Sequence, residues 1–327
     1  MGKILEIHDL KVCFHTEDGT VHALNNVDLT LEDGITLGLV GETGAGKTTL
    51  AKSIMRLIPS PPGKIENGEI IYDGKNILEL SDTDIMSIRG QEISMIFQDP
   101  MSSLNPVITV GDQIAEVIQV HNKDLDKKEV FNRACEMLEM VGISADRAFD
   151  YPHQFSGGMK QRVVIAMALA CNPRILIADE PTTALDVTIQ AQVLEMMREL
   201  KQKFNTATLL ITHDLGVVAQ MCEKVAIMYA GEIVESGTVH DIFNNTLHPY
   251  TEGLLGAIPK IHLHEKRLQP IEGLMPDPMD MPKGCIFCDR CKYATERCKN
   301  EHPQITNVGG EHTVRCFLRQ DEKGGEE

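Results

Sequence analysis

The sequence feature that most constrains the fold is a glycine-rich loop at residues 41–48, with the letters GETGAGKT. It follows an apolar strand pattern at residues 36–40 and precedes a helical pattern at residues 49–57. Glycines let backbone N–H groups turn toward a phosphate, the lysine adds a positive charge, and the threonine offers a hydroxyl to Mg²⁺. The loop therefore predicts a nucleotide phosphate site. The residues expected to contact ATP are Gly41, Gly44, Gly46, Lys47, Thr48 and Thr49.

The spacing of apolar residues predicts an α/β fold around this loop. Helical spacing over residues 110–141 indicates a helical insertion. Elsewhere, strand and helix patterns alternate, which is typical of a mainly parallel sheet covered on both faces. The expected strands span residues 5–14, 21–31, 36–40, 175–178, 208–211 and 225–229, and expected helices span 188–203 and 215–222.

Charge and hydropathy exclude several classes of protein. The chain has 48 acidic and 31 basic residues, for a net charge of -17, which repels nucleic acid and anionic lipid. We therefore expect no nucleic-acid partner. No apolar run approaches the roughly 18 residues of a membrane span. We expect a cytoplasmic protein that reaches a membrane only through a partner.

Acidic and imidazole side chains follow two further strand patterns. Asp179 and Glu180 end an apolar strand, which suits Mg²⁺ coordination by Asp179 and activation of water by Glu180. The alternative is a solvated acidic loop, which the phosphate loop makes a poorer explanation. His213 follows another strand, at the edge where open α/β sheets bind ligands. A lone histidine there is more often structural.

The segment 155–162, FSGGMKQR, resembles the signature peptide of the ATP-binding-cassette (ABC) family. Gln98 and residues 183–186, TALD, complete the ordered set of family motifs. The resemblance covers residues 1 to about 258. It implies an ABC nucleotide-binding domain with a P-loop NTPase fold: a RecA-like core sheet, an antiparallel β subdomain and a helical subdomain at about residues 100–165.

The resemblance also implies a site shared by two domains packed head to tail. The signature residues of one domain would contact the γ-phosphate bound by Lys47 of the other. Glu180 would polarise the attacking water, and Gln98 would sense Mg²⁺ and link to a membrane partner. Mg²⁺ would be held by Thr48, Gln98 and Asp179. The remaining residues assigned in this way are Ser156, Gly157 and Gly158 of the signature, His213 at the γ-phosphate, Asp186 joining the two sites, and Phe14, which is either an adenine-stacking or a core residue.

Residues 98–106, residues 248–251 and the cysteine-rich tail look like those of ATPase subunits of bacterial dipeptide and oligopeptide importers. Nickel importers and importers of other peptide-like cargo share these segments. The branch implies a sister ATPase, with a homodimer as the lesser option. It also implies two integral membrane permease subunits, an extracytoplasmic substrate-binding protein and a location at the cytoplasmic face of the membrane.

Two other classes of protein are alternatives to an importer subunit. A soluble, non-transport ABC ATPase acting on DNA or ribosomes would usually carry two cassettes or a basic surface. A metal-binding regulator that uses nucleotide only as a switch would not need Glu180 and His213. ATP turnover by the purified chain separates these classes.

Prolines after residue 258 indicate a linker into a small loop-rich appendage at residues 259–327. Five cysteines lie in it, and a reducing cytoplasm leaves a metal or unligated thiols as the alternatives. The short spacing of the first three cysteines favours Zn²⁺. Importers with this tail carry Gly-Cys, Arg-Cys and two later cysteines, which implies a [4Fe–4S] cluster instead. Its ligands would be Cys285, Cys291, Cys298 and Cys316, with Cys288 as a bystander or substitute ligand.

Overall fold

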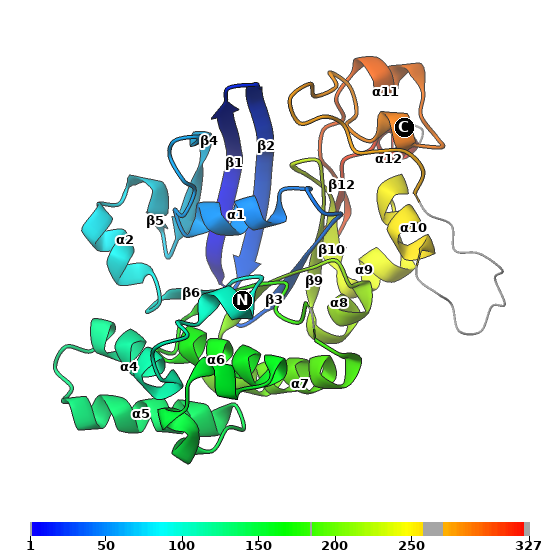
Figure 1. Cartoon of the computed structure of the whole chain (residues 1–327). Coiled ribbons are helices and arrows are strands. Elements are labelled where there is room, and N and C mark those ends of the chain that lie inside the picture. The colour runs from blue at the N-terminus through cyan, green and yellow to red at the C-terminus, as the bar shows by residue number, and fades with distance from the viewer. Residues whose placement is uncertain (1, 184, 258–270, 324–327) are drawn as a thin grey trace. The chain divides into compact units, whose positions relative to one another are not determined.

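The computed structural model describes residues 2–183, 185–257 and 271–323 of the chain. The chain forms two compact units (Figure 1). The first unit comprises Met1–Ile4, Leu31–Thr36 and Asn76–Ile211, and the second comprises Leu5–Thr30, Leu37–Lys75 and Thr212–Glu327. The predicted linker begins at Pro259, and its part up to residue 270 lies outside the described residues.

Parallel strands form the sheet of the first unit. β6 (Ile93–Ile96), β7 (Ile175–Asp179) and β8 (Ala207–Thr212) lie in the order β8-β7-β6. Ile93 is in register with Ile175, and Ile175 with Ala207. All residues of these strands are buried, as expected for parallel strands covered on both faces. The predicted α/β class is confirmed.

The helical insertion expected at residues 110–141 consists of two helices. α4 (Val110–His121) is capped by Thr109, and α5 (Lys127–Met140) begins with a capping box at Asp126. Both pack against α6 (Gly157–Leu169). Apolar faces at helical spacing bury this contact, while polar caps fix where each helix starts. The other helices of the unit are η1 (Ile77–Glu79), α2 (Asp82–Ile88), α3 (Pro100–Ser103), η2 (Ala145–Phe149), η3 (Pro152–Gln154) and α7 (Val187–Phe204).

An antiparallel sheet forms one part of the second unit, in the order β2-β1-β4-β5. β1 pairs antiparallel with β4, from Leu5 opposite Tyr72 to Phe14 opposite Gly63. A turn at residues 17–18 joins the first two strands, because β1 ends at Thr16 and β2 starts at Gly19. The strands are β1 (Lys3–Thr16), β2 (Gly19–Glu32), β4 (Gly63–Tyr72) and β5 (Lys75–Asn76).

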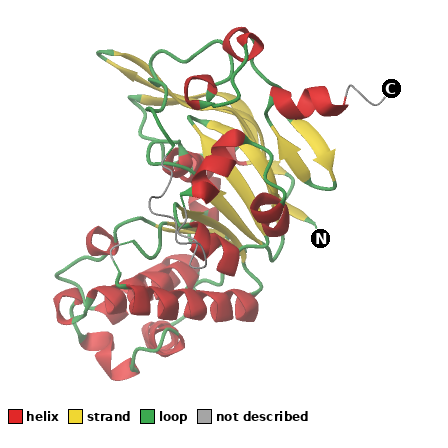
Figure 2. Ribbon diagram, turned by 90° about the vertical axis from the view of Figure 1, so that its right-hand side faces the viewer, coloured by secondary structure: helices red, strands yellow, loops and turns green. Residues whose placement is uncertain are grey.

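A second sheet of this unit joins the phosphate-loop strand to the C-terminal hairpin (Figure 2). Its order is β11-β12-β10-β9-β3. β3 pairs parallel with β9, whereas β10 pairs antiparallel with both β9 and β12. The C-terminal segment thereby extends the sheet that carries the loop. The strands are β3 (Thr36–Val40), β9 (Lys224–Tyr229), β10 (Glu232–Thr238), β11 (Thr306–Gly309) and β12 (His312–Val314).

The core of the second unit includes side chains from the cysteine-rich segment. The ring of Phe287 meets that of Tyr229 edge-on at 5.2 Å and lies 5.5 Å from that of Tyr250. All three are buried. The helices of this unit are α1 (Lys47–Ile54), α8 (Leu215–Met221), α9 (Val239–Asn244), α10 (Pro249–Gly256), η4 (Cys288–Arg290), α11 (Glu296–Asn300) and α12 (Phe317–Lys323).

No helix within the described ranges has the length and apolar character that crossing a bilayer requires.

Candidate functional site

The phosphate loop of the second unit has the geometry its glycines predict. A Cβ at Gly41 would lie 2.2 Å from the carbonyl oxygen of Met228 on β9, so only glycine fits against that strand. Gly46 has φ +104° and precedes the first residue of α1. A Cβ there would also lie 2.7 Å from the carbonyl oxygen of Ala23. The loop is therefore held close to two strands.

Lys47 lies inside this loop and is buried. Its Nζ donates to the carbonyl oxygens of Gly41 at 2.7 Å and Glu42 at 2.9 Å. Thr48 and Thr49 follow in the first turn of α1 and are half-buried. A lysine and a helix N-terminus at one loop form a site suited to a polyphosphate. The helix predicted to begin at residue 49 starts two residues earlier, which places Lys47 in its first turn.

Glu42, within the loop, contacts two residues far along the chain. Its backbone N–H donates to the hydroxyl of Tyr250 at 3.0 Å, and its carboxylate accepts from Arg290 at 2.7 Å. Local sequence patterns predict no role for Glu42, Tyr250 or Arg290. The Arg-Cys pair at residues 290–291 is the one local pattern that includes Arg290, and it indicates a role for the cysteine only.

Phe14 and His213 belong to the same unit as the loop. Phe14 lies on β1, half-buried, and its ring stands 3.0 Å from where a Cβ at Gly63 would be. His213 follows β8 and is exposed, next to Asp214, which caps α8. As predicted, Phe14 lies on a strand and His213 directly follows one. Their contacts with a nucleotide stay predictions.

The acidic residues of the first unit are held by their neighbours. Asp179 ends β7 and is buried. Glu180 follows with φ +49°, the left-handed region, which a non-glycine residue occupies at a cost of about 1–3 kcal/mol. Its carboxylate Oε2 accepts from Gln98 Nε2 at 3.2 Å and from Thr183 Oγ1 at 2.9 Å. The fold thus brings Gln98 and Glu180 together across 82 residues. The role of Thr183 at this carboxylate was not foreseen.

The signature segment forms the start of α6 in this unit. Ser156 is exposed and caps the helix by accepting from the N–H of Met159 at 3.4 Å. Gly158 allows α7 to approach, because a Cβ there would lie 2.4 Å from Cγ2 of Ile189. Gly157 has open space around its Cα. Asp186 caps α7 through the N–H of Ile189 at 3.0 Å, and residue 184 of the same motif lies outside the described residues.

Two of the candidate cysteines are brought together by a glycine. The N–H of Cys285 donates to the carbonyl oxygen of Cys298 at 2.8 Å. A Cβ at Gly284 would lie 2.2 Å from the same oxygen, so the Gly-Cys pair permits this close approach. Burial is the main cause that raises the pKa of Cys285 to about 12, and charge on Cys298, Cys316 and Cys291 contributes to the same rise.

The pKa values of Cys291 and Cys316 are raised for the same reasons. Burial is the main cause that raises the pKa of Cys316 and Cys291, and charge on Cys298 adds to both. All nine cysteines are free thiols. No group of three or more His, Cys, Asp or Glu residues in the described ranges is arranged to hold a metal ion.

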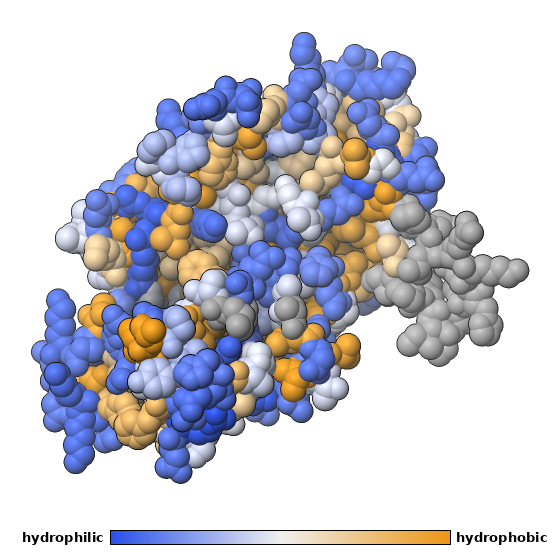
Figure 3. All heavy atoms as spheres, viewed as in Figure 1, coloured by the Kyte–Doolittle hydropathy of each residue, from blue (hydrophilic) through white to orange (hydrophobic). Residues whose placement is uncertain are grey.

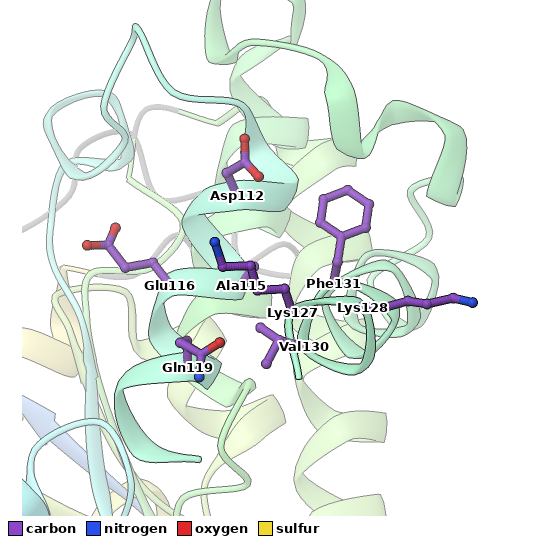
Figure 4. Close-up of a pocket in the computed structure, with 8 residues that line it drawn as sticks. All are labelled: Asp112, Ala115, Glu116, Gln119, Lys127, Lys128, Val130 and Phe131. Carbon is purple, nitrogen blue, oxygen red and sulfur yellow. The ribbon is translucent and has the colours of Figure 1, made fainter. Parts of the chain in front are cut away.

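A hollow of about 450 Å³ lies between α4 and α5 of the first unit (Figure 4). The residues that line it include both acidic and basic side chains, and those of Glu116 and Lys128 extend in opposite directions (Figure 4). None of the predicted site residues lies on these two helices. The lining residues are Asp112, Ala115, Glu116, Gln119, Lys127, Lys128, Val130 and Phe131.

Exposed apolar side chains interrupt the polar surface of the helical part (Figure 3). Such side chains mark a partner surface when they gather in a patch. The most exposed of them in the described part of this unit are Met86, Phe97, Val107, Val120, Phe149, Tyr151 and Val187.

Comparison with known proteins identifies two family models in the chain. The ABC transporter model matches residues 24–183, which include the loop, Gln98, the signature and the acidic strand. The oligopeptide/dipeptide transporter C-terminal region model matches residues 234–298, which include four of the five clustered cysteines.

Relatives and solved structures agree with these models. The chain is 50% identical to the oligopeptide transport ATP-binding protein AppD of Bacillus subtilis, over 98% of both chains. It is 49% identical to the dipeptide transport ATP-binding protein DppD of the same organism, over 99% of this chain and 96% of the relative. A dimeric structure of the ATP-binding cassette MJ0796 bound to ADP and phosphate superposes with a TM-score of 0.65 at 28% identity. That comparison covers 72% of this chain and 98% of the cassette.

Proposed function

The chain belongs to the ABC transporter family, and on that premise we propose that it is the ATP-hydrolysing subunit of a dipeptide or oligopeptide importer. It has the P-loop NTPase fold of the family's cassettes. The observation that carries the proposal is the contact of Glu180 with Gln98 directly after the buried Asp179. The peptide cargo is supported by the near full-length similarity to AppD and DppD.

We infer the following roles for the nucleotide-site residues. Lys47 and the loop N–H groups bind the phosphates, while Thr48, Gln98 and Asp179 hold Mg²⁺. Glu180 accepts hydrogen-bond donation from the attacking water, and Gln98 and Thr183 orient that carboxylate. The left-handed backbone of Glu180 fixes its direction. His213 contacts the γ-phosphate, and Phe14 lies against the base.

A dimer would complete the site. Ser156 is exposed and presents a helix N-terminus, a group that attracts phosphate. We propose that Ser156, Gly157 and Gly158 contact nucleotide bound to a sister ATPase and that Asp186 joins the two sites. The dimeric ADP-bound cassette MJ0796 supports this arrangement.

The remaining partners are two integral membrane permease subunits and, through them, an extracytoplasmic substrate-binding protein. We propose that the exposed apolar side chains of the helical part, including Phe97, Val107 and Phe149, face the permease. With these partners, we propose that the subunit works at the cytoplasmic face of the membrane.

We propose that the cysteine-rich segment binds a [4Fe–4S] cluster through Cys285, Cys291, Cys298 and Cys316. Two observations support it: the Gly284-dependent approach of Cys285 to Cys298, and the electrostatic influence of Cys291 and Cys298 on Cys285 and Cys316. The role assigned to the cluster is to stabilise the segment.

ATPase activity of the complete complex in lipid vesicles tests the proposed function. Receptor loaded with di- or oligopeptides should stimulate ATP hydrolysis, whereas nickel chelates should not. Stimulation by chelates alone would contradict peptide import. Absence of ATP hydrolysis under every condition would contradict the ATPase assignment.

A further inference from the structure

Arg290 of the cysteine-rich segment forms a two-pronged ion pair with Glu42 of the phosphate loop. Nη1 lies 2.7 Å from Oε2 of Glu42, and Nη2 lies 3.0 Å from Oε1. The arginine side chain is 5% exposed and that of the glutamate 31%. A planar guanidinium matches a carboxylate in this way, and a lysine cannot.

The surroundings of Arg290 are built for this side chain. Nε donates to the carbonyl oxygen of Glu272 at 3.0 Å, and Nη2 donates to that of Ile271 at 3.2 Å. The guanidinium also lies over the ring of Tyr229, 5.6 Å from its centroid. Gly273, at φ +84°, passes so close that a Cβ there would lie 3.2 Å from Cγ of Arg290. The guanidinium is thus held by several neighbours besides Glu42.

Glu42 carries this constraint to the residue that binds phosphate. Its N–H donates to Tyr250 Oη, and its carbonyl oxygen accepts from Lys47 Nζ at 2.9 Å. Glu42 is therefore held at its backbone by Tyr250 and at its side chain by Arg290. Pre-organising a binding loop improves affinity by reducing the entropy lost on binding.

We propose that Arg290 is a positioning residue of the nucleotide site: it fixes Glu42, and with it the loop conformation that Lys47 needs to bind ATP. This inference rests on the proposed function and deepens it. The cysteine-rich segment then contributes to nucleotide affinity through the arginine beside Cys291. Loss of that arginine should weaken the binding of MgATP and MgADP alike, because both place phosphates in the loop.

Nucleotide titration of the purified full-length chain tests this inference. Arg290→Gln should raise the Kd for MgATP about tenfold, which corresponds to about 1.4 kcal/mol. Glu42→Gln should do the same, and the double variant should be no weaker than the weaker single variant, because both remove one interaction. Arg290→Lys should restore only part of the affinity. The melting temperature of each variant is recorded alongside its Kd.

Lys292→Gln is the matched control. It lies two residues on, and its Nζ is 2.8 Å from Oε1 of Glu252 in an exposed ion pair. Its Kd should match that of the wild type. If Arg290→Gln fails to fold, Glu42→Gln alone decides, because its side chain is partly exposed.

A wild-type Kd in Arg290→Gln, with or without a lower melting temperature, would overturn the inference and leave a structural role only. Additive effects of the two single variants would also overturn it. The failure of the proposed function would look different: the wild type would not bind MgATP, or Lys47→Ala would bind it equally well.

Discussion

At the scale of single residues, Glu180 is the most informative residue. Its backbone has a left-handed conformation, and its carboxylate accepts hydrogen bonds from Gln98 and Thr183. Glu180→Gln keeps the shape of the side chain and removes the group that polarises water. Turnover should fall about a hundredfold or more, the contribution typical of general base catalysis. MgATP affinity should persist because Lys47, Thr48 and Asp179 are unchanged.

Steady-state ATPase assays of the complex, with nucleotide titration alongside, measure both quantities. Thr183→Val is an informative companion, because it removes one donor to the carboxylate and should reduce turnover less than Glu180→Gln. Wild-type turnover in Glu180→Gln would remove this residue from the mechanism.

At the scale of elements, the start of α10 contains a histidine that should make stability depend on pH. His248 is buried, and its Nδ1 accepts from the N–H of Tyr250 at 3.0 Å, so the neutral ring caps the helix. Burial lowers the pKa of His248 to about 4, below its ordinary value of 6.5. The unfolded chain therefore binds more protons than the folded chain between these two values.

Stability from this group is present above pH 6.5 and is lost as the pH falls toward 4. Between pH 7 and pH 5 the loss should be about 2 kcal/mol. Thermal unfolding of the wild type and of His248→Asn, which can cap the helix without titrating, measures the difference. Identical pH profiles of the two proteins would contradict the prediction.

The cysteine-rich segment gives a second prediction at this scale. Anaerobically purified protein should be brown and contain iron and acid-labile sulfide. Cys291→Ser should lose both, whereas Cys288→Ser should keep them, because the proposed ligands omit Cys288. Metal analysis with sulfide determination decides: stoichiometric zinc without sulfide would exclude the cluster, and iron loss in Cys288→Ser would change the ligand set.

At the scale of the whole molecule, the proposed dimer makes one chain serve the site of another. Ser156→Arg should leave the Kd of the isolated chain for MgATP unchanged and abolish ATP turnover by the complex, because the new side chain would block the sister site. His153→Arg adds the same side chain to an exposed position three residues earlier and serves as the control. Loss of nucleotide binding by the isolated Ser156→Arg chain would contradict a shared site.

Local patterns in the sequence determined much of the fold. The phosphate loop could be read directly, because glycine, lysine and threonine at fixed spacing have one common backbone solution between a strand and a helix. The six expected strands and α7 match the structure to within a few residues, because burial imposes their periodicity, whereas β4, β10 and the C-terminal hairpin were not predicted. The family resemblance assigned both Gln98 and Glu180 to the nucleotide site, whereas their contact with each other was not predicted.

Contacts between distant segments were decided only by the tertiary structure. Arg290 meets Glu42 across 248 residues, and nothing in the local spacing of either residue encodes that meeting. The positive φ of Glu180 depends on the strands and loop that hold it. The appendage, expected from its prolines to be loop-rich, inserts Phe287 into a core built by Tyr229 and Tyr250. Sequence patterns report which residues a local backbone can accommodate, whereas packing selects which distant side chains share the same space.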